Sequence, residues 1–170
     1  MSYYSLLGLR QEPFSNSPDP DLLYRSPHTA RCLHELEIAV RLHRGLNVIF
    51  GQVGTGKTTI CRELLRQLSD DPRIRTFLIL DPGYRTQLEF VRALGTTLGV
   101  PEPQRDTLQA YKDGIQNWLL TRVDEHGETV ALLIDEGQKI RDDCLEILRE
   151  LLNFETNTAK LLQIVLFAQT

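Results

Sequence analysis

A glycine-rich segment of eight residues constrains this chain more than any other feature. Residues 51–58 read Gly-Gln-Val-Gly-Thr-Gly-Lys-Thr, which fits the phosphate-loop pattern G-x-x-x-x-G-K-[ST], and Thr59 follows. An apolar run at 46–50 leads into the segment, and a run with helical spacing at 59–68 leads out of it. This strand–loop–helix context distinguishes a nucleotide-binding loop from a glycine-rich turn. We therefore predict that the segment binds phosphate groups.

The residue types in this segment suit phosphate binding. Glycines let the backbone curl so that successive N–H groups point at one anion, and the N-terminus of the following helix adds partial positive charge. Lys57 is expected to reach the β- and γ-phosphates, which makes it a catalytic residue, and the Thr58 hydroxyl is expected to coordinate Mg²⁺. The expected cofactors are thus ATP and Mg²⁺. The expected nucleotide-binding residues are Gly51, Gln52, Val53, Gly54, Thr55, Gly56, Lys57, Thr58 and Thr59.

The remainder of the chain alternates apolar strands with amphipathic helices. Strands that are continuous apolar runs favour a parallel sheet with helices on both faces, so we expect a three-layer α/β fold of the P-loop NTPase class. Ligands of such sheets bind at the carboxyl ends of the strands. Predicted strands span residues 46–50, 74–80, 130–134 and 161–167, and predicted helices span 27–43, 58–69, 87–98, 108–126 and 143–154, the last with Leu145, Leu148, Leu151 and Leu152 inward.

The third predicted strand ends in two acids, Asp135 and Glu136. Asp135 is expected to bind Mg²⁺ through a metal-bound water, and Glu136 to orient or activate the water that attacks the γ-phosphate. Each acid also has a simpler explanation, since many strands end in Asp as a helix cap and Glu136 could be an exposed acid. The phosphate loop earlier in the chain favours the catalytic interpretation.

The spacing of the elements also predicts the order of the strands. A strand and two helices separate the phosphate loop from the acidic strand, so the two are not expected to be neighbours in the sheet. The fourth strand would lie between them, and Gln169 at its end would face the γ-phosphate, where it could sense phosphate or position water. The alternative is a solvated residue at a chain end.

Composition restricts the class of protein. The 170 residues are enough for one α/β domain, and a net charge of −4 disfavours a dedicated nucleic-acid binder. No apolar run approaches the roughly 20 residues of a membrane span, and residues 1–5 are unlike a signal peptide, so a cytosolic chain is expected. Residues 1–27 are expected to form an extended N-terminal arm and residues 28–170 the ATPase core. The last strand is followed by no closing helix, which indicates a C-terminally truncated fragment without a helical lid.

Motifs throughout the chain resemble one family. Its N-terminal signature matches Tyr3-Tyr4, Leu7-Gly8-Leu9, Pro13-Phe14, Pro18-Asp19-Pro20, Leu23-Tyr24 and His28, and further matches are 51–59, 133–138, 145–149, 152–156 and 160–166. With these residues the chain resembles the ExeA-type general secretion pathway ATPases. The family departs from this chain in having Ala where Gly137 stands and in continuing with Gly-Gln-Pro-Glu-Leu where this chain has Ala168-Gln169-Thr170.

The resemblance implies an AAA+ ATPase of the ASCE type that works at the cytoplasmic face of the bacterial inner membrane. It also implies a homo-oligomer, a secretion-pathway membrane partner, assistance to secretin assembly, and a membrane span beyond these residues. The family's helical lid and arginine finger would follow Thr170, and Phe14 and Tyr24 are candidates for packing at the adenine.

Two other functions remain open at this point. A DNA-linked AAA+ ATPase of the transposon target-selector type shares much of the signature, but would need a basic face and salt-sensitive DNA binding. A nucleotide-binding module without turnover is the second, because a missing arginine finger alone costs about 10³–10⁵ in rate. A small-molecule P-loop kinase ranks lower, since no lid for an acceptor can be identified.

Overall fold

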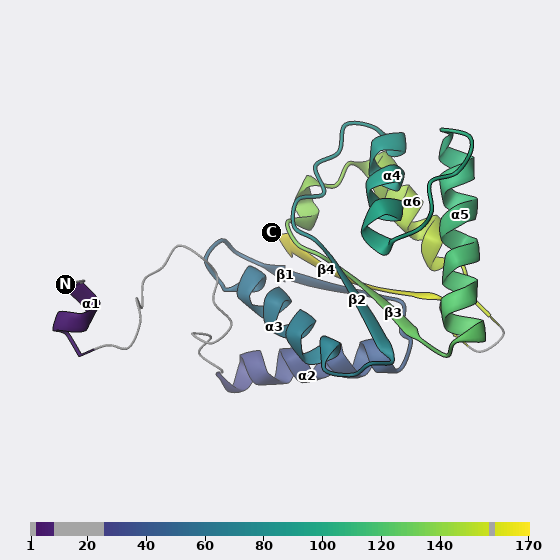
Figure 1. The fold of residues 1–170 in the computed structure, drawn as a ribbon. Helices are drawn as coiled ribbons and strands as arrows, with labels where there is room; N and C mark the ends of the chain where they lie inside the picture. The colour runs from purple at the N-terminus through teal and green to yellow at the C-terminus, as the bar shows by residue number, and fades with distance from the viewer. Residues whose placement is uncertain (1–2, 9–25, 157–158) are drawn as a thin grey trace.

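A parallel sheet organises the computed structural model, which describes residues 3–8, 26–156 and 159–170. Within these residues four strands pair in the order β1-β4-β3-β2, and every neighbouring pair is parallel (Figure 1). The predicted insertion of the fourth strand between the loop strand and the acidic strand is confirmed. The strands are β1 (Leu46–Gly51), β2 (Ile74–Ile79), β3 (Thr129–Ile134) and β4 (Leu162–Gln169).

Helices cover both faces of the sheet, which confirms the predicted three-layer α/β architecture. In Figure 1, α2 and α3 lie below the strands, whereas α4, α5 and α6 lie above them. The larger helices are α2 (Pro27–Arg41), α3 (Lys57–Ser69), α4 (Gln87–Leu98), α5 (Leu108–Leu120) and α6 (Asp142–Leu152).

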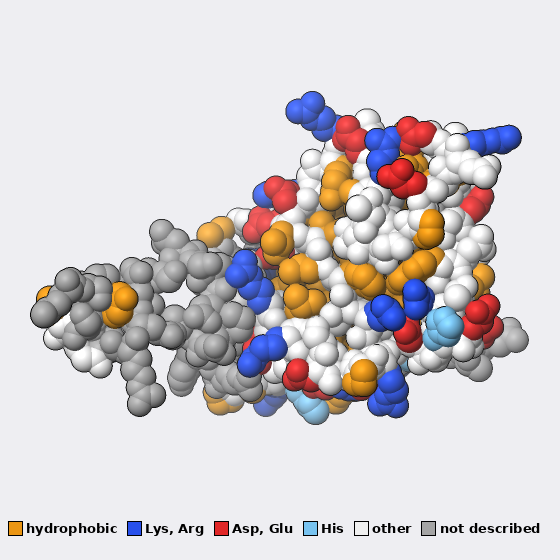
Figure 2. Space-filling view, in the orientation of Figure 1, with side chains coloured by type: hydrophobic (Ala, Val, Ile, Leu, Met, Phe, Trp, Pro, Cys, Tyr) orange, Lys and Arg blue, Asp and Glu red, His pale blue; other side chains and the backbone are white. Residues whose placement is uncertain are grey.

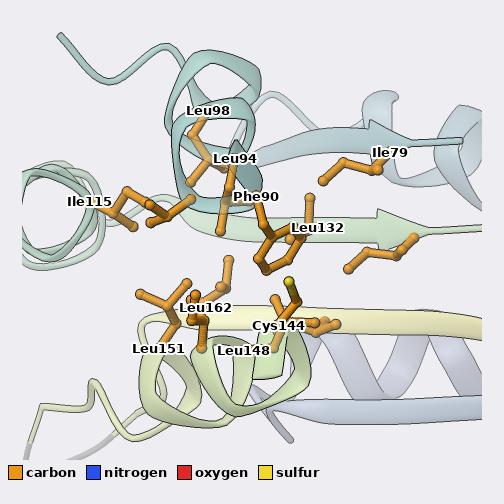
Figure 3. Close-up of a cluster of buried hydrophobic side chains, with 14 of the residues drawn as sticks. Ile79, Phe90, Leu94, Leu98, Ile115, Leu132, Cys144, Leu148, Leu151 and Leu162 are labelled. Atoms are coloured by element: carbon orange, nitrogen blue, oxygen red, sulfur yellow. The ribbon is translucent and has the colours of Figure 1, made fainter. Parts of the chain in front are cut away.

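Each face of the sheet has its own hydrophobic core. On the upper face Phe90, Leu132 and Leu148 belong to one buried cluster, and Figure 3 shows how helical and strand side chains meet there. On the lower face Leu64 and Phe167 belong to the other cluster. The central strands β3 and β4 are therefore buried on both sides, which explains why their sequences are continuous apolar runs rather than alternating ones.

One polar side chain, Gln163, is buried inside β4. Its Oε1 accepts a hydrogen bond of 2.8 Å from the Gly45 backbone N–H, and its Nε2 donates one of 2.9 Å to the Lys160 carbonyl. Both ends of the amide are thus partnered, as burial of a polar group requires. These bonds fix the start of β1 beside β4, and so set the register that brings the phosphate loop next to the end of β4.

Several predicted details differ from the structure: α6 ends at Leu152 instead of residue 154, and β4 ends at Gln169 instead of residue 167. Helix α2 ends at Arg41 instead of residue 43, because His43 adopts the left-handed conformation with φ of 54°. Helix α5 ends at Leu120 and continues as a π-helical turn, Thr121–Glu125. Leu145 of α6 is 39% exposed rather than inward, since Cys144, Ile147, Leu148 and Leu151 form the buried stripe. Leu145 lies beside that stripe, at its edge.

The N-terminal arm is described only in part. Residues 3–6 form the short helix α1 (Tyr3–Leu6), which is a helical segment within the predicted extended arm with turns. Phe14 and Tyr24, the candidates for adenine packing, lie outside the described residues. Among the described residues, no helix combines the length and the apolar character that a membrane span needs.

Candidate nucleotide-binding site

The carboxyl ends of three parallel strands bring the predicted site residues to one edge of the sheet. Gly51, the first residue of the phosphate loop, ends β1 and is in register with Gln169 at the end of β4. Asp135 and Glu136 directly follow β3, the strand on the other side of β4. Residues that are far apart in the sequence therefore meet where the topology of a doubly covered parallel sheet places a ligand.

The loop itself depends on its glycines. Gly54 and Gly56 have φ of 77° and 82°, in the left-handed region that other residues rarely adopt. A Cβ on Gly51 would lie 2.8 Å from Thr55 Oγ1, which is too close for another side chain. That hydroxyl donates to the Gln52 carbonyl over 2.8 Å and so closes the loop on itself. The sequence pattern thus corresponds to a formed loop that ends at the N-terminus of α3.

Lys57 begins α3, and its side chain turns back over the loop. Its Nζ donates to the carbonyl oxygens of Gly51 (2.8 Å) and Gln52 (2.9 Å). An ammonium carries three donors, so these two bonds leave one for an anion. The first N–H groups of an α-helix also lack intrahelical partners, which adds donors directed at the same place. Loop, ammonium and helix N-terminus together form a site suited to phosphate.

Asp135 is buried, with a relative exposure of 2%, and directly follows β3. Burial first, and the negative charge of Asp135 second, raise the pKa of the Cys61 thiol to about 12. Cys61 stands three residues after Thr58 on α3, and residues three apart share a face of a helix. Asp135 directly follows β3 and Thr58 is the second residue of α3, so both residues lie at the strand edge that carries the phosphate loop. Hard oxygen donors of these two types suit Mg²⁺.

Glu136 follows Asp135 but points elsewhere. Its backbone has φ of 54°, and its side chain is 40% exposed, in contrast to the buried Asp135. The Asp135 carboxylate accepts a 2.9 Å hydrogen bond from the Glu136 N–H, which stabilises this sharp turn after the strand. The two acids thus diverge: the Asp135 side chain is buried, and the Glu136 side chain reaches partly into solvent at the edge of the site.

Sequence reasoning missed one residue of this region, Gln138. It lies in the 3₁₀ turn η3 (Gly137–Lys139), where its Nε2 donates to Glu136 Oε2 over 2.8 Å and its Oε1 accepts from the Gln169 N–H over 2.9 Å. A Gln shortly after a strand is too common to signal a site by itself. The predicted role of the Gln169 side chain stays a prediction, because the bond that Gln169 makes here uses its backbone.

Comparison with known proteins places this geometry in context. A family model described as an AAA domain matches residues 40–170. General secretion pathway protein A from Aeromonas hydrophila is 36% identical over 167 residues, which cover 98% of this chain and 30% of that protein. The resemblance seen in the motifs is therefore confirmed along nearly the whole chain, which spans 30% of the length of this curated relative.

Two solved structures share the fold. Cdc6p from Pyrobaculum aerophilum has a TM-score of 0.68 at 19% identity, covering 93% of this chain and 42% of that one. The ORC2 protein from Aeropyrum pernix has a TM-score of 0.63 at 15% identity, covering 92% of this chain and 44% of that one. At these identities the likeness is one of fold.

Proposed function

This chain belongs to the AAA domain family, and from that premise we propose that it binds ATP with Mg²⁺ and hydrolyses it to ADP and phosphate. The observation that carries the proposal is the position of Lys57. Its ammonium bonds two carbonyl oxygens of a formed phosphate loop, at the N-terminus of a helix, and the buried Asp135 ends β3 at the same edge of the sheet. A structural role alone does not require a cation, a helix N-terminus and a buried acid at one strand edge.

In this proposal, residues 51–59 bind the triphosphate through backbone N–H groups, and Lys57 contacts the β- and γ-phosphates. The Thr58 hydroxyl and Asp135 would hold Mg²⁺, with Asp135 acting through a water. When bound, Mg²⁺ neutralises charge on the β- and γ-phosphate oxygens. The side chain of Gln169, at the end of β4 beside Gly51, would sense the γ-phosphate or position water.

The catalytic step assigned to Glu136 is proton removal. The Glu136 carboxylate takes a proton from a water molecule as the water oxygen forms a bond to the γ-phosphorus. The bond from that phosphorus to the oxygen bridging the β- and γ-phosphates breaks, and its electron pair stays with ADP. The Glu136 side chain is 40% exposed and is therefore accessible to a water molecule, whereas Asp135 is buried.

The cellular role proposed for the protein is in secretion across the cell envelope. The support is the 36% identity to general secretion pathway protein A over nearly the whole chain. We place the ATPase at the cytoplasmic face of the inner membrane, as a homo-oligomer that works with a secretion-pathway membrane partner in secretin assembly. A membrane span would belong to sequence outside residues 1–170.

A DNA-linked role finds less support on the surface of the protein. Arg41 and Arg73 both pair with Asp71, and Arg75 pairs with Glu128 over 2.5 Å. Figure 2 shows Lys and Arg side chains mixed with Asp and Glu over the visible face. Cations that are already paired with carboxylates contribute little to phosphate binding along a nucleic acid. The secretion role is therefore the one we propose.

Removal of the metal tests the hydrolysis proposal directly. Phosphate release from ATP by this chain is expected to require Mg²⁺, to yield ADP and phosphate in equal amounts, and to stop when EDTA exceeds the metal, because Mg²⁺ neutralises charge that develops on the phosphates. The measurement is a phosphate-release assay with ADP quantified in parallel. Tight binding of Mg·ATP without release would overturn hydrolysis in favour of a binding module, and neither binding nor release would contradict the whole proposal.

A further inference from the structure

A single side chain, Gln138, joins two parts of the candidate site. Its Nε2 is 2.8 Å from Glu136 Oε2, and its Oε1 is 2.9 Å from the backbone nitrogen of Gln169. A backbone N–H can only donate, so the amide oxygen must face Gln169 and the NH₂ group must face the carboxylate. The orientation of the Gln138 amide is therefore fixed by its partners.

The turn that carries Gln138 is packed tightly against β4. A Cβ on Gly137 would lie 2.6 Å from Leu166 Cδ1 and 3.1 Å from the Phe167 carbonyl oxygen, so the turn packs closely against β4 and even an Ala here would require the Leu166 side chain to shift. The turn is also closed internally, by hydrogen bonds from the Lys139 N–H to Glu136 and from the Ile140 N–H to Gly137. Gln138 is thus held on a backbone that has little room to shift.

We propose that Gln138 is a positioning residue for ATP hydrolysis, which acts by holding the Glu136 carboxylate relative to the end of β4. The inference rests on the proposed role of Glu136 as the base. Gln169 is in register with Gly51 of the phosphate loop. The hydrogen bond between Gln138 and the Gln169 N–H therefore fixes the position of the Glu136 carboxylate relative to the end of β4, the strand beside the loop. A carboxylate held by one donor samples fewer positions than a free one, and precise placement of the base contributes strongly to rate.

The neighbouring cation, Lys139, interacts more weakly with the Glu136 carboxylate. Lys139 Nζ lies 4.0 Å from Glu136 Oε2 but 3.4 Å from Asp81 Oδ2, and its side chain is 46% exposed. Exposed ion pairs at such distances contribute little. The Gln138 amide, also exposed, bonds the carboxylate directly over 2.8 Å and is anchored to the Gln169 N–H, so of the two groups it is the one that positions the Glu136 side chain.

Gln138 and its two hydrogen bonds, to Glu136 and to Gln169, form what we call the Gln138 bridge. Two substitutions test these two bonds separately. Gln138→Leu removes both bonds, whereas Gln138→Glu keeps an acceptor for the Gln169 N–H but places a second negative charge beside Glu136. Both variants are expected to lose about 10- to 100-fold in kcat while the Kd for Mg·ATP stays within about threefold, because the base is displaced and the phosphate loop is untouched. Gln109→Leu, an exposed Gln on α5, is the matched control and should keep parental kcat.

A double variant tests whether Gln138 acts through Glu136. Once the carboxylate is absent there is nothing for the amide to hold, so Glu136→Gln with Gln138→Leu should be no slower than Glu136→Gln alone. If Gln138→Leu slows Glu136→Gln by a further tenfold, Gln138 acts independently and the inference is wrong. Unchanged kcat in Gln138→Leu would likewise overturn it.

A measurement without nucleotide tests the bridge separately from activity. Hydrogen exchange of the Gln169 backbone amide should be about tenfold faster in Gln138→Leu than in the parent, and close to parental in Gln138→Glu. Equal exchange in all three proteins would show that the bridge does not form in solution. Absence of turnover in the parent would contradict the proposed function and remove the positioning role with it, while the exchange rates would still decide whether the bridge exists.

Discussion

Replacement of Lys57 by Ala is expected to weaken binding of Mg·ATP at least about a hundredfold. In the structure the ammonium donates to two loop carbonyl oxygens, and in the complex one of these donors would turn to phosphate, so that two of its three donors bond the β- and γ-phosphates. Hydrogen bonds that involve a charged partner contribute roughly 1.5–3 kcal/mol each, and two of them correspond to a factor of about 100 or more in affinity. Isothermal titration calorimetry of the parent and the variant measures the change.

The control for this experiment removes the positive charge of a different lysine, away from the phosphate loop. Lys112 on α5 pairs with Glu150 of α6. Both helices lie on the upper face of the sheet, and Lys112 is far from the phosphate loop in the sequence. Lys112→Ala should bind Mg·ATP with parental affinity. Circular dichroism and thermal unfolding of both variants would show whether the fold is kept. Parental affinity in Lys57→Ala would mean that residues 51–59 do not form the nucleotide site.

Replacement of Glu136 by Gln is expected to lower turnover by about 10²–10⁴, the range typical for loss of a general base. The amide is nearly the same size as the carboxylate but cannot take a proton from water. Because the Glu136 side chain is 40% exposed and lies outside the phosphate loop, the affinity for Mg·ATP should change little. Single-turnover phosphate release and calorimetric titration together separate the two effects.

An exposed acid away from the site provides the comparison for this variant. Glu102, in the segment between α4 and α5, is exposed, and Glu102→Gln should hydrolyse ATP at the parental rate. Full turnover in Glu136→Gln would remove Glu136 from catalysis, and with it the basis for a positioning role of Gln138. A loss of binding equal to the loss of turnover would assign Glu136 to nucleotide binding instead.

The parts of the fold that sequence predicted well are those in which local pattern and global topology agree. The buried strands β3 and β4 are continuous apolar runs because both of their faces are covered, and the spacing between loop and acids predicted the insertion of β4. Helix α4 was predicted with its observed bounds, since Thr86 caps its start and Gly99, with φ of 75°, ends it.

Other features depend on contacts between distant residues and could not be read from the sequence. His43 adopts a left-handed conformation without being Gly, and the N–H of Gly45, two residues later, donates to Gln163 of β4. Leu145 is as apolar as Leu148, but it lies outside the stripe that faces the sheet. The bond from Gln138 to Gln169 joins residues 31 positions apart, so only the folded chain reveals it.

The central claim is that residues 51–59 bind the phosphates of ATP, and the most direct test is a map of backbone amides in the unmodified chain. The nitrogen-15-labelled protein would be titrated with Mg²⁺ and a non-hydrolysable ATP analogue. We expect saturable amide shifts that are largest for residues 52–59, where the N–H groups of the loop and of the first turn of α3 meet the phosphates. Shifts confined to another surface, or none at saturating analogue, would contradict the account.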